Sequence, residues 1–127
     1  WPLVRARLPQ ARLRLVGADP VRAVLRLAAH EGVEVTGPVE ELCDVWPSAG
    51  LLLAPLRFST GIQNKVLEAM AAGVPVVTTP AVAEAIGAVH GEHLLAGSGA
   101  PALADAVVET LAEPVAPKGS VTVTVAV

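Results

Sequence analysis

The sequence predicts an α/β fold in which a mostly parallel sheet is covered by helices on both faces. Short apolar runs recur along the chain, and those at 51–54, 74–77 and 94–96 contain no polar residue, as expected of strands that are buried on both faces. Helical patterns lie between several of these runs, which is the order that βαβ units and right-handed crossovers produce. Hydrophobic residues make up 53% of the 127 residues, yet aromatic residues only 2%. The core therefore consists of Val, Leu and Ala, which favours layered packing over a small aromatic-centred β-barrel.

Five apolar runs are the predicted strands of this sheet. They are Leu13–Val16, Val33–Val35, Leu51–Ala54, Val74–Val77 and Leu94–Ala96. Helical spacing predicts the elements between them. Asp19 is a good N-cap ahead of Pro20, and the helix that follows is stopped by Gly32. Glu40–Trp46 is a shorter and weaker helix, and Pro101 opens a longer one.

The stretch GIQNKVLEAMAAGVPVVTTP predicts a helix that leads into a buried strand. Thr60 and Gln63 have the spacing of a capping box, so the helix is expected to begin at Gly61. Ile62 and Val66 share one face of it.

Polar side chains gather at the start of this helix. Asn64, Lys65 and Glu68 share a second face, and no polar side chain follows from Ala69 to Val77. A solvated helix face usually stays polar over its whole length. We therefore expect the helix to be buried except at its N-terminal end.

Such a helix start is suited to phosphate, because its N–H groups and partial positive charge attract anions. It would lie at the carboxyl end of strand Leu51–Ala54, where open parallel sheets bind ligands. Arg57 and Lys65 would add positive charge, and Glu68 could accept hydrogen bonds from sugar hydroxyls. The pattern indicates a nucleotide diphosphate. The alternative is a surface ion pair between Lys65 and Glu68, worth well under about 1 kcal/mol.

A resemblance supports the first interpretation. The stretch PLRFSTGIQNKVLEAMAAGVPVVTTPAVAEAIGAVHGEHLLAG resembles the donor-binding domain of retaining GT-B glycosyltransferases. It is most similar to bacterial polysaccharide-type members of group 1, which read roughly G-x-Q-x-K-x-x-E-A-M-A-x-G-x-P-V-V. The resemblance covers about Leu8 to Pro114 and implies a Rossmann-like three-layer sheet, the truncated donor half of a GT-B fold.

The resemblance also implies roles for individual residues. Glu68 matches the glutamate that holds the donor ribose, and Arg57 and Lys65 match diphosphate contacts. The remaining donor-binding positions are at the helix start: Thr60, Gly61, Ile62, Gln63 and Asn64. Many relatives carry an earlier glutamate where this chain has Thr60, so the contact of that glutamate with the donor sugar is not carried over. Thr78, Thr79 and Glu84 are expected to line the cleft.

By this resemblance the parent enzyme transfers a sugar from a nucleotide diphosphate donor to an acceptor, in surface polysaccharide or glycoconjugate synthesis, without a required metal or other cofactor. The acceptor domain and the first strand of the donor half are expected to be missing, so the chain alone is expected to be inactive. Two alternatives stay open. One is a non-catalytic α/β binding or interaction domain, and the other is a fragment of a GT-B-type nucleotide-sugar epimerase.

Composition excludes several other classes of protein. The net charge is -3 and the chain has no basic block, so a nucleic-acid partner is not expected. No apolar run reaches the roughly 20 residues of a membrane span, and the arginines near the N-terminus do not fit a signal peptide, so neither is expected. The single Cys43 cannot form an internal disulfide and fits a reducing cytoplasm, with the thiol as a small core residue. His90 and His93 are expected in a surface loop rather than at a metal.

The end of the chain has a different character. Residues 1–114 form the predicted domain, 115–119 a linker and 120–127 an extra strand. The tail SVTVTVAV alternates Val with Thr and Ala, which is typical of a strand with two different faces. Because a lone strand leaves its N–H and C=O groups unpaired, we expect the tail to add to a sheet edge, within its own chain or exchanged with a second copy in a homodimer.

Overall fold

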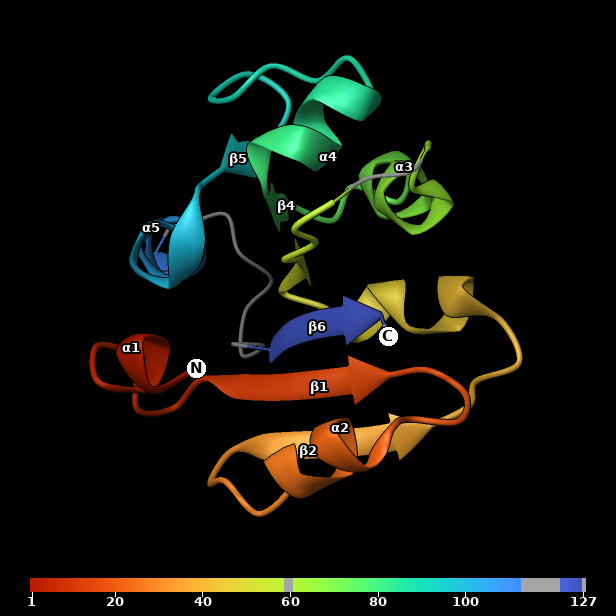
Figure 1. The fold of residues 1–127 in the computed structure, drawn as a ribbon, viewed down its shortest axis with the longest axis vertical. Coiled ribbons are helices and arrows are strands. Elements are labelled where there is room, and N and C mark those ends of the chain that lie inside the picture. The colour runs from red at the N-terminus through yellow and green to blue at the C-terminus, as the bar shows by residue number, and fades with distance from the viewer. Residues whose placement is uncertain (59–60, 113–121, 127) are drawn as a thin grey trace.

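The computed structural model describes residues 1–58, 61–112 and 122–126, and it confirms the predicted Rossmann-like α/β class. Within these residues six strands form one sheet in which every pairing is parallel (Figure 1). The strands are β1 (Arg12–Val16), β2 (Val33–Gly37), β3 (Leu51–Ala54), β4 (Val76–Thr78), β5 (Leu95–Ala96) and β6 (Thr122–Ala126). All five predicted apolar runs are therefore strands, with ends shifted by at most two residues.

Helices cover both faces of the sheet. They are α1 (Pro2–Arg5), α2 (Arg22–Leu27), α3 (Asn64–Ala71), α4 (Pro80–Ala85) and α5 (Gly99–Ala112), with 3-10 turns η1 (Leu42–Asp44) and η2 (Trp46–Ser48). Figure 1 shows α5 and α3 on opposite sides of β3 and β4. The strand side chains divide between two hydrophobic clusters: Leu51 packs with α5 on one face, and Leu52 packs with α3 on the other. A parallel strand that is buried on both faces needs the continuous apolar run seen in the sequence.

Strand β6 occupies the centre of the sheet. The strand order is β2-β1-β6-β3-β4-β5, so the last described segment of the chain lies between β1 and β3. Val123 is the partner of Leu13 in β1 and of Leu51 in β3. Doubly wound sheets usually have the order 3-2-1-4-5-6, and here the C-terminal strand stands where the first strand of that order would stand.

The prediction that the tail adds to a sheet edge is therefore wrong. An edge strand satisfies one row of backbone N–H and C=O groups, whereas a strand between β1 and β3 satisfies two. The pairing lies within one chain. The predicted linker at 115–119 and the tail residues Ser120, Val121 and Val127 lie outside the described residues.

Helix α3 differs from its prediction in two ways. It begins at Asn64 rather than Gly61, and its N-cap Gln63 makes no side-chain capping bond. Its outer face is also exposed along its whole length, since Leu67 is 40% exposed and Ala71 and Ala72 are exposed too. The expectation of burial beyond the first turns is wrong, because alanine is small enough to be tolerated on a solvated face.

The C-terminal end of α3 is set by its own backbone. Gly73 adopts a φ of 77°, its N–H donates to the Met70 carbonyl, and the Val74 N–H donates to the Ala69 carbonyl. This is the Schellman arrangement, in which glycine adopts the left-handed conformation at least cost. Pro75 then directs the chain into β4.

Other local predictions also need correction. Asp19 has a positive φ of 47° and does not cap α2, whose N-cap is Val21. Two 3-10 turns, at 42–44 and 46–48, take the place of the short α-helix predicted at 40–46, and α5 begins at Gly99, two residues before Pro101. Cys43 is exposed rather than part of the core, because η1 turns it outward. Over the described part of the chain, no helix is both long enough and apolar enough to cross a membrane.

The central position of β6 predicts opposite effects for two neighbouring substitutions. Val123 is fully buried in an apolar cluster, so Val123→Thr adds a buried hydroxyl and should lower the free energy of unfolding by about 1–3 kcal/mol. The Thr124 hydroxyl is buried with no hydrogen-bond partner, so Thr124→Val should be neutral or stabilising. Urea denaturation measures both. Equal, near-zero effects of the two substitutions would contradict a buried central strand.

Candidate functional site

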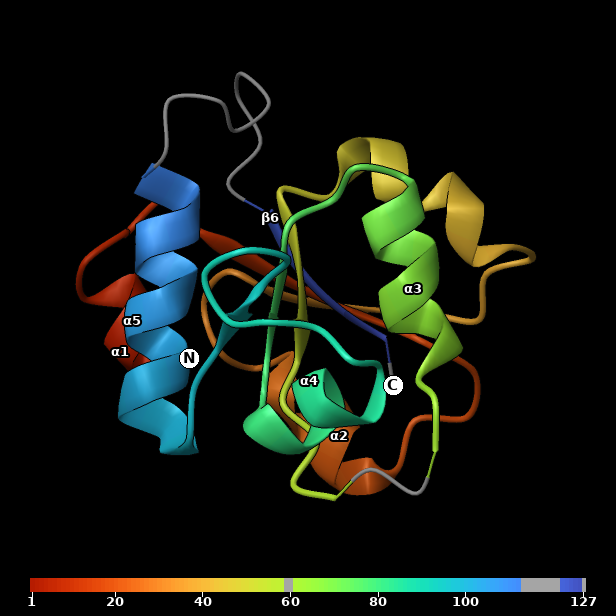
Figure 2. The ribbon, with the colours of Figure 1, turned by 90° about the horizontal axis from the view of Figure 1, so that it is seen from above.

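The candidate site lies where the carboxyl ends of the central strands meet the start of α3. From the centre of the sheet, the chain runs outward through β1 and β2 on one side and through β3, β4 and β5 on the other. Ligands of open α/β sheets bind in the crevice beyond the strand ends at such a reversal. Figure 2 shows the C-terminal end of β6 beside the first turn of α3.

Two threonines predicted to line the cleft hold the strand ends in place. The Thr78 hydroxyl donates a 2.8 Å hydrogen bond to the Ala54 carbonyl at the end of β3. The Thr79 hydroxyl donates one of 2.7 Å to the Leu56 carbonyl in the following loop. Thr78 is fully buried and Thr79 partly buried, so both act on the backbone that leads towards α3.

Lys65 connects α3 to the C-terminal strand. Its ammonium donates a 2.9 Å hydrogen bond to the carbonyl of Ala126, the last residue of β6. The side chain is partly buried, and this burial lowers the pKa of Lys65 below its ordinary value of 10.5. No described carboxylate forms an ion pair with it, since the described ion pairs are Arg5–Glu31, Arg7–Asp105 and Arg14–Glu34. The alternative of a Lys65–Glu68 surface ion pair is therefore not seen in the structure.

The other predicted donor-binding residues surround this lysine at the surface. Gln63 and Lys65 are partly buried. The exposed members of the set are Arg57, Gly61, Ile62, Asn64 and Glu68, with Glu84 exposed on α4. Thr60 lies outside the described residues. The structure thus brings Gln63, Asn64, Lys65 and Glu68 together within the first turns of α3, and places Arg57 in the loop between β3 and α3.

Two apolar side chains flank the same loop. Phe58 is 84% exposed and Ile62 is 63% exposed, on either side of the two residues that are not described. Ile62 precedes α3, so it does not share the buried helix face of Val66 that helical spacing predicts.

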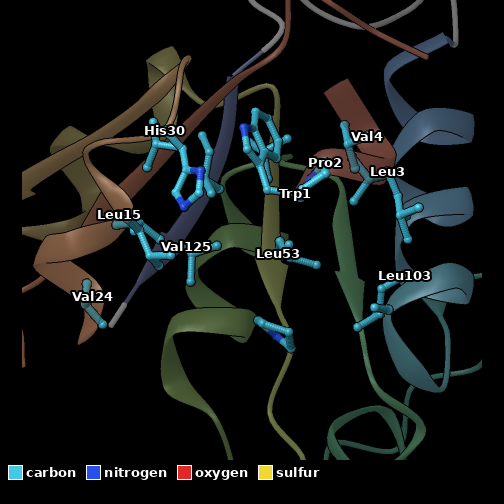
Figure 3. A pocket seen from close by; sticks show the side chains of 18 residues that line it. Trp1, Pro2, Leu3, Val4, Leu15, Val24, His30, Leu53, Leu103 and Val125 are labelled. Atoms are coloured by element: carbon cyan, nitrogen blue, oxygen red, sulfur yellow. The ribbon is translucent and has the colours of Figure 1, made fainter. Parts of the chain in front are cut away.

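An apolar hollow lies on the other face of the sheet. It is a groove of about 580 Å³ between α2 and α5, lined by aliphatic side chains such as Leu15, Leu53 and Val125 together with Trp1 and His30 (Figure 3). Its lining contains no Lys, Arg, Asp or Glu, so it offers no cation to a phosphate. Sequence reasoning did not find this groove, because it arises from the spacing of helices rather than from any local pattern.

A second hollow, of about 680 Å³, is polar. It lies at the amino ends of β1 and β2, where Arg5 pairs with Glu31 and Arg14 pairs with Glu34. Two of its three arginines are thus neutralised, and it is at the wrong end of the strands for a ligand of an open α/β sheet.

The histidine pair lies at the surface, as predicted. Each Nδ1 accepts a hydrogen bond from a backbone N–H, His93 from Val89 and His90 from Ala96. These bonds hold the loop that leads into β5. Among the residues described, no three His, Cys, Asp or Glu side chains are grouped as a metal would require.

Sequence reasoning missed the contribution of β6 to the site. The Val and Thr alternation identified the strand, but nothing in it indicated that Ala126 would end beside Lys65. That contact joins residues 61 positions apart.

Comparison with known proteins finds a family match over most of the chain. Residues 1–113 match the sequence model of the family described as glycosyl transferases group 1. A stretch of 74 residues is 36% identical to an exopolysaccharide phosphotransferase of Streptomyces coelicolor. That stretch is 54% of this chain and only 8% of the relative.

The lowered pKa of Lys65 predicts a pH dependence of stability. Between the lowered pKa and 10.5 the unfolded chain binds more protons than the folded chain, so the contribution of Lys65 to the free energy of unfolding rises with pH in that range. The difference in unfolding free energy between the natural chain and Lys65→Met should therefore increase from neutral pH towards 10.5. Urea denaturation at several pH values measures it, with Arg26→Met, at an exposed position, as the control. A difference that stays constant with pH would contradict the burial of the ammonium.

Proposed function

Because the chain belongs to the group 1 glycosyl transferases, we propose that it binds the nucleotide diphosphate-sugar donor of a sugar transfer reaction. The observation that carries the proposal is the partly buried Lys65 ammonium at the start of α3, beside the carboxyl ends of the central strands and without a carboxylate partner among the described residues. A cation in that position is available to an anionic ligand.

The diphosphate would bind at the first turn of α3. The N–H groups of a helix start carry a partial positive charge, and Lys65 adds a full charge within the same turn. Arg57 lies exposed in the loop before the helix and would reach the same ligand. These groups would stabilise the negative charge that develops on the leaving nucleotide diphosphate as the glycosidic bond breaks.

Glu68 would hold the donor ribose. It is exposed one helical turn beyond Lys65, and its carboxylate forms no ion pair within the described residues. An ionised carboxylate accepts hydrogen bonds only, so it suits a pair of sugar hydroxyls and repels the phosphates. Because Lys65 lies at the helix start and Glu68 one turn beyond it, the nucleotide would lie along α3 with its phosphates at the helix start and its ribose further along.

The acceptor belongs, in this proposal, to the synthesis of a polysaccharide or a glycoconjugate. The relative from Streptomyces is an exopolysaccharide phosphotransferase by name, which supports this setting. The group 1 family supports transfer of a sugar rather than of a phosphate.

Loss of the Glu68 carboxylate should weaken donor binding. Glu68→Ala removes charge-assisted hydrogen bonds to the ribose, so the binding free energy of a nucleotide diphosphate should fall by about 1–3 kcal/mol. Calorimetry with a panel of nucleoside diphosphates measures the change. Glu109→Ala is the matched control, because Glu109 is equally exposed but lies on α5, on the opposite side of the sheet. Equal affinity for Glu68→Ala and the natural chain would exclude the ribose role.

The chain by itself is expected to bind donor without transferring sugar. Sugar transfer requires an acceptor held in line with the donor, and this proximity supplies much of the catalysis. This proposal assigns a donor site, and no acceptor site, to the sheet described here. Mass spectrometry of nucleotide sugars incubated with the purified chain and a set of acceptors would detect transfer. A glycosylated product above the background of a Lys65→Ala variant would overturn this expectation.

A further inference from the structure

The strand that builds the middle of this sheet comes from the far end of the chain. Strand β6 pairs with β1 over five residues, from Arg12↔Thr122 to Val16↔Ala126, and with β3 at Leu51↔Val123 and Leu52↔Thr124. It therefore fills the central position, and its carboxyl end lies at the edge of the sheet where ligands of open α/β sheets bind.

A hydrogen bond joins this end of β6 to α3. The Ala126 carbonyl at the end of β6 accepts a 2.9 Å hydrogen bond from the Lys65 ammonium in the first turn of α3. A flexible lysine side chain loses considerable rotamer freedom when it is held in this way. A backbone carbonyl neutralises none of its charge, in contrast to a carboxylate.

The ammonium keeps donors for a ligand. Lysine has three N–H donors, and the Ala126 carbonyl is the one partner described for them. The remaining two are available to phosphate oxygens at the start of α3. The carbonyl thus orients the ammonium without neutralising its positive charge.

We propose that β6 is a working part of the donor site, in which the Ala126 carbonyl positions the Lys65 ammonium for the diphosphate. This inference rests on the proposed function for the identity of the anion, but the contact itself can be tested without any ligand. Coupling between two binding events is reciprocal. An anion that binds Lys65 in this position would therefore also favour the arrangement in which β6 lies between β1 and β3.

The first test measures the contact in the natural chain. Lys65 and Lys118 are the only lysines, so the side-chain ammonium signals in a ¹⁵N-labelled sample can be assigned by a Lys65→Arg variant. A hydrogen-bonded ammonium exchanges its protons with water slowly, and a Lys65 signal that is observable at neutral pH is the expected result. A Lys65 ammonium that exchanges as fast as free lysine would overturn the inference.

The second test is a double-mutant cycle that uses inorganic pyrophosphate as the probe, followed by NMR titration. One arm is Lys65→Ala, and the other is deletion of residues 125–127, which removes the Ala126 carbonyl but keeps both described pairings of β6 with β3. Each change alone should weaken pyrophosphate binding about tenfold, the loss of a charge-assisted hydrogen bond. In the Lys65→Ala background the deletion should have little further effect, because the group it positions is gone.

Thr124→Val is the matched control for the strand, since it alters β6 two residues before Ala126 and leaves the carbonyl in place, and it should leave pyrophosphate affinity unchanged. Circular dichroism establishes that each variant is folded.

A folded deletion variant with unchanged affinity would overturn the inference, as would equal losses from the deletion in both backgrounds. Should the deletion variant fail to fold, the Lys65 ammonium signal of the natural chain decides the matter. Failure of the natural chain to bind pyrophosphate would overturn the proposed function, while that same signal would still decide whether β6 holds Lys65.

Discussion

The hydrogen-bonding requirement of two facing strands is the constraint on which this structure depends. Without β6, β1 and β3 would each present an unpaired row of backbone N–H and C=O groups inside the sheet, where water cannot satisfy them. Strand β6 satisfies both rows at once and buries Val123 completely between the two halves. The two hydrophobic clusters lie on the faces of this sheet, so the layers above and below it also depend on the strand.

The same strand connects stability with the candidate site. Parallel strands bring their carboxyl ends to one edge of the sheet, and α3 begins at that edge. Side-chain hydroxyls of Thr78 and Thr79 fix the ends of β3 and of the loop beyond it, and Lys65 is held by the end of β6. Lys65 is thus held by a backbone carbonyl rather than by a neighbouring side chain. A cation that is held by a neutral carbonyl retains its charge for an anion.

Much of the architecture is predictable from particular residues. The runs at Leu51–Ala54 and at 74–77 are apolar at consecutive positions, and this pattern identifies strands buried on both faces. Helix ends were predicted less well. Asp19 has the chemistry of a cap, but its positive φ and the position of Pro20 leave the capping role to the backbone at Val21. The burial of α3 was overestimated, because Ala71 and Ala72 are as acceptable on a solvated face as in a core.

The sequence by itself determined the element types, the α/β class and the grouping of Gln63, Asn64, Lys65 and Glu68 at the start of one helix, because helical periodicity and apolar runs are local properties. Only the tertiary structure decided where the tail strand lies and what Lys65 contacts. Alternating Val and Thr specify an extended strand with two faces, but they are compatible with an edge, an exchanged strand or a central position. The choice depends on which backbone groups are left unpaired elsewhere in the sheet, and here those groups belong to β1 and β3, far from β6 in the chain.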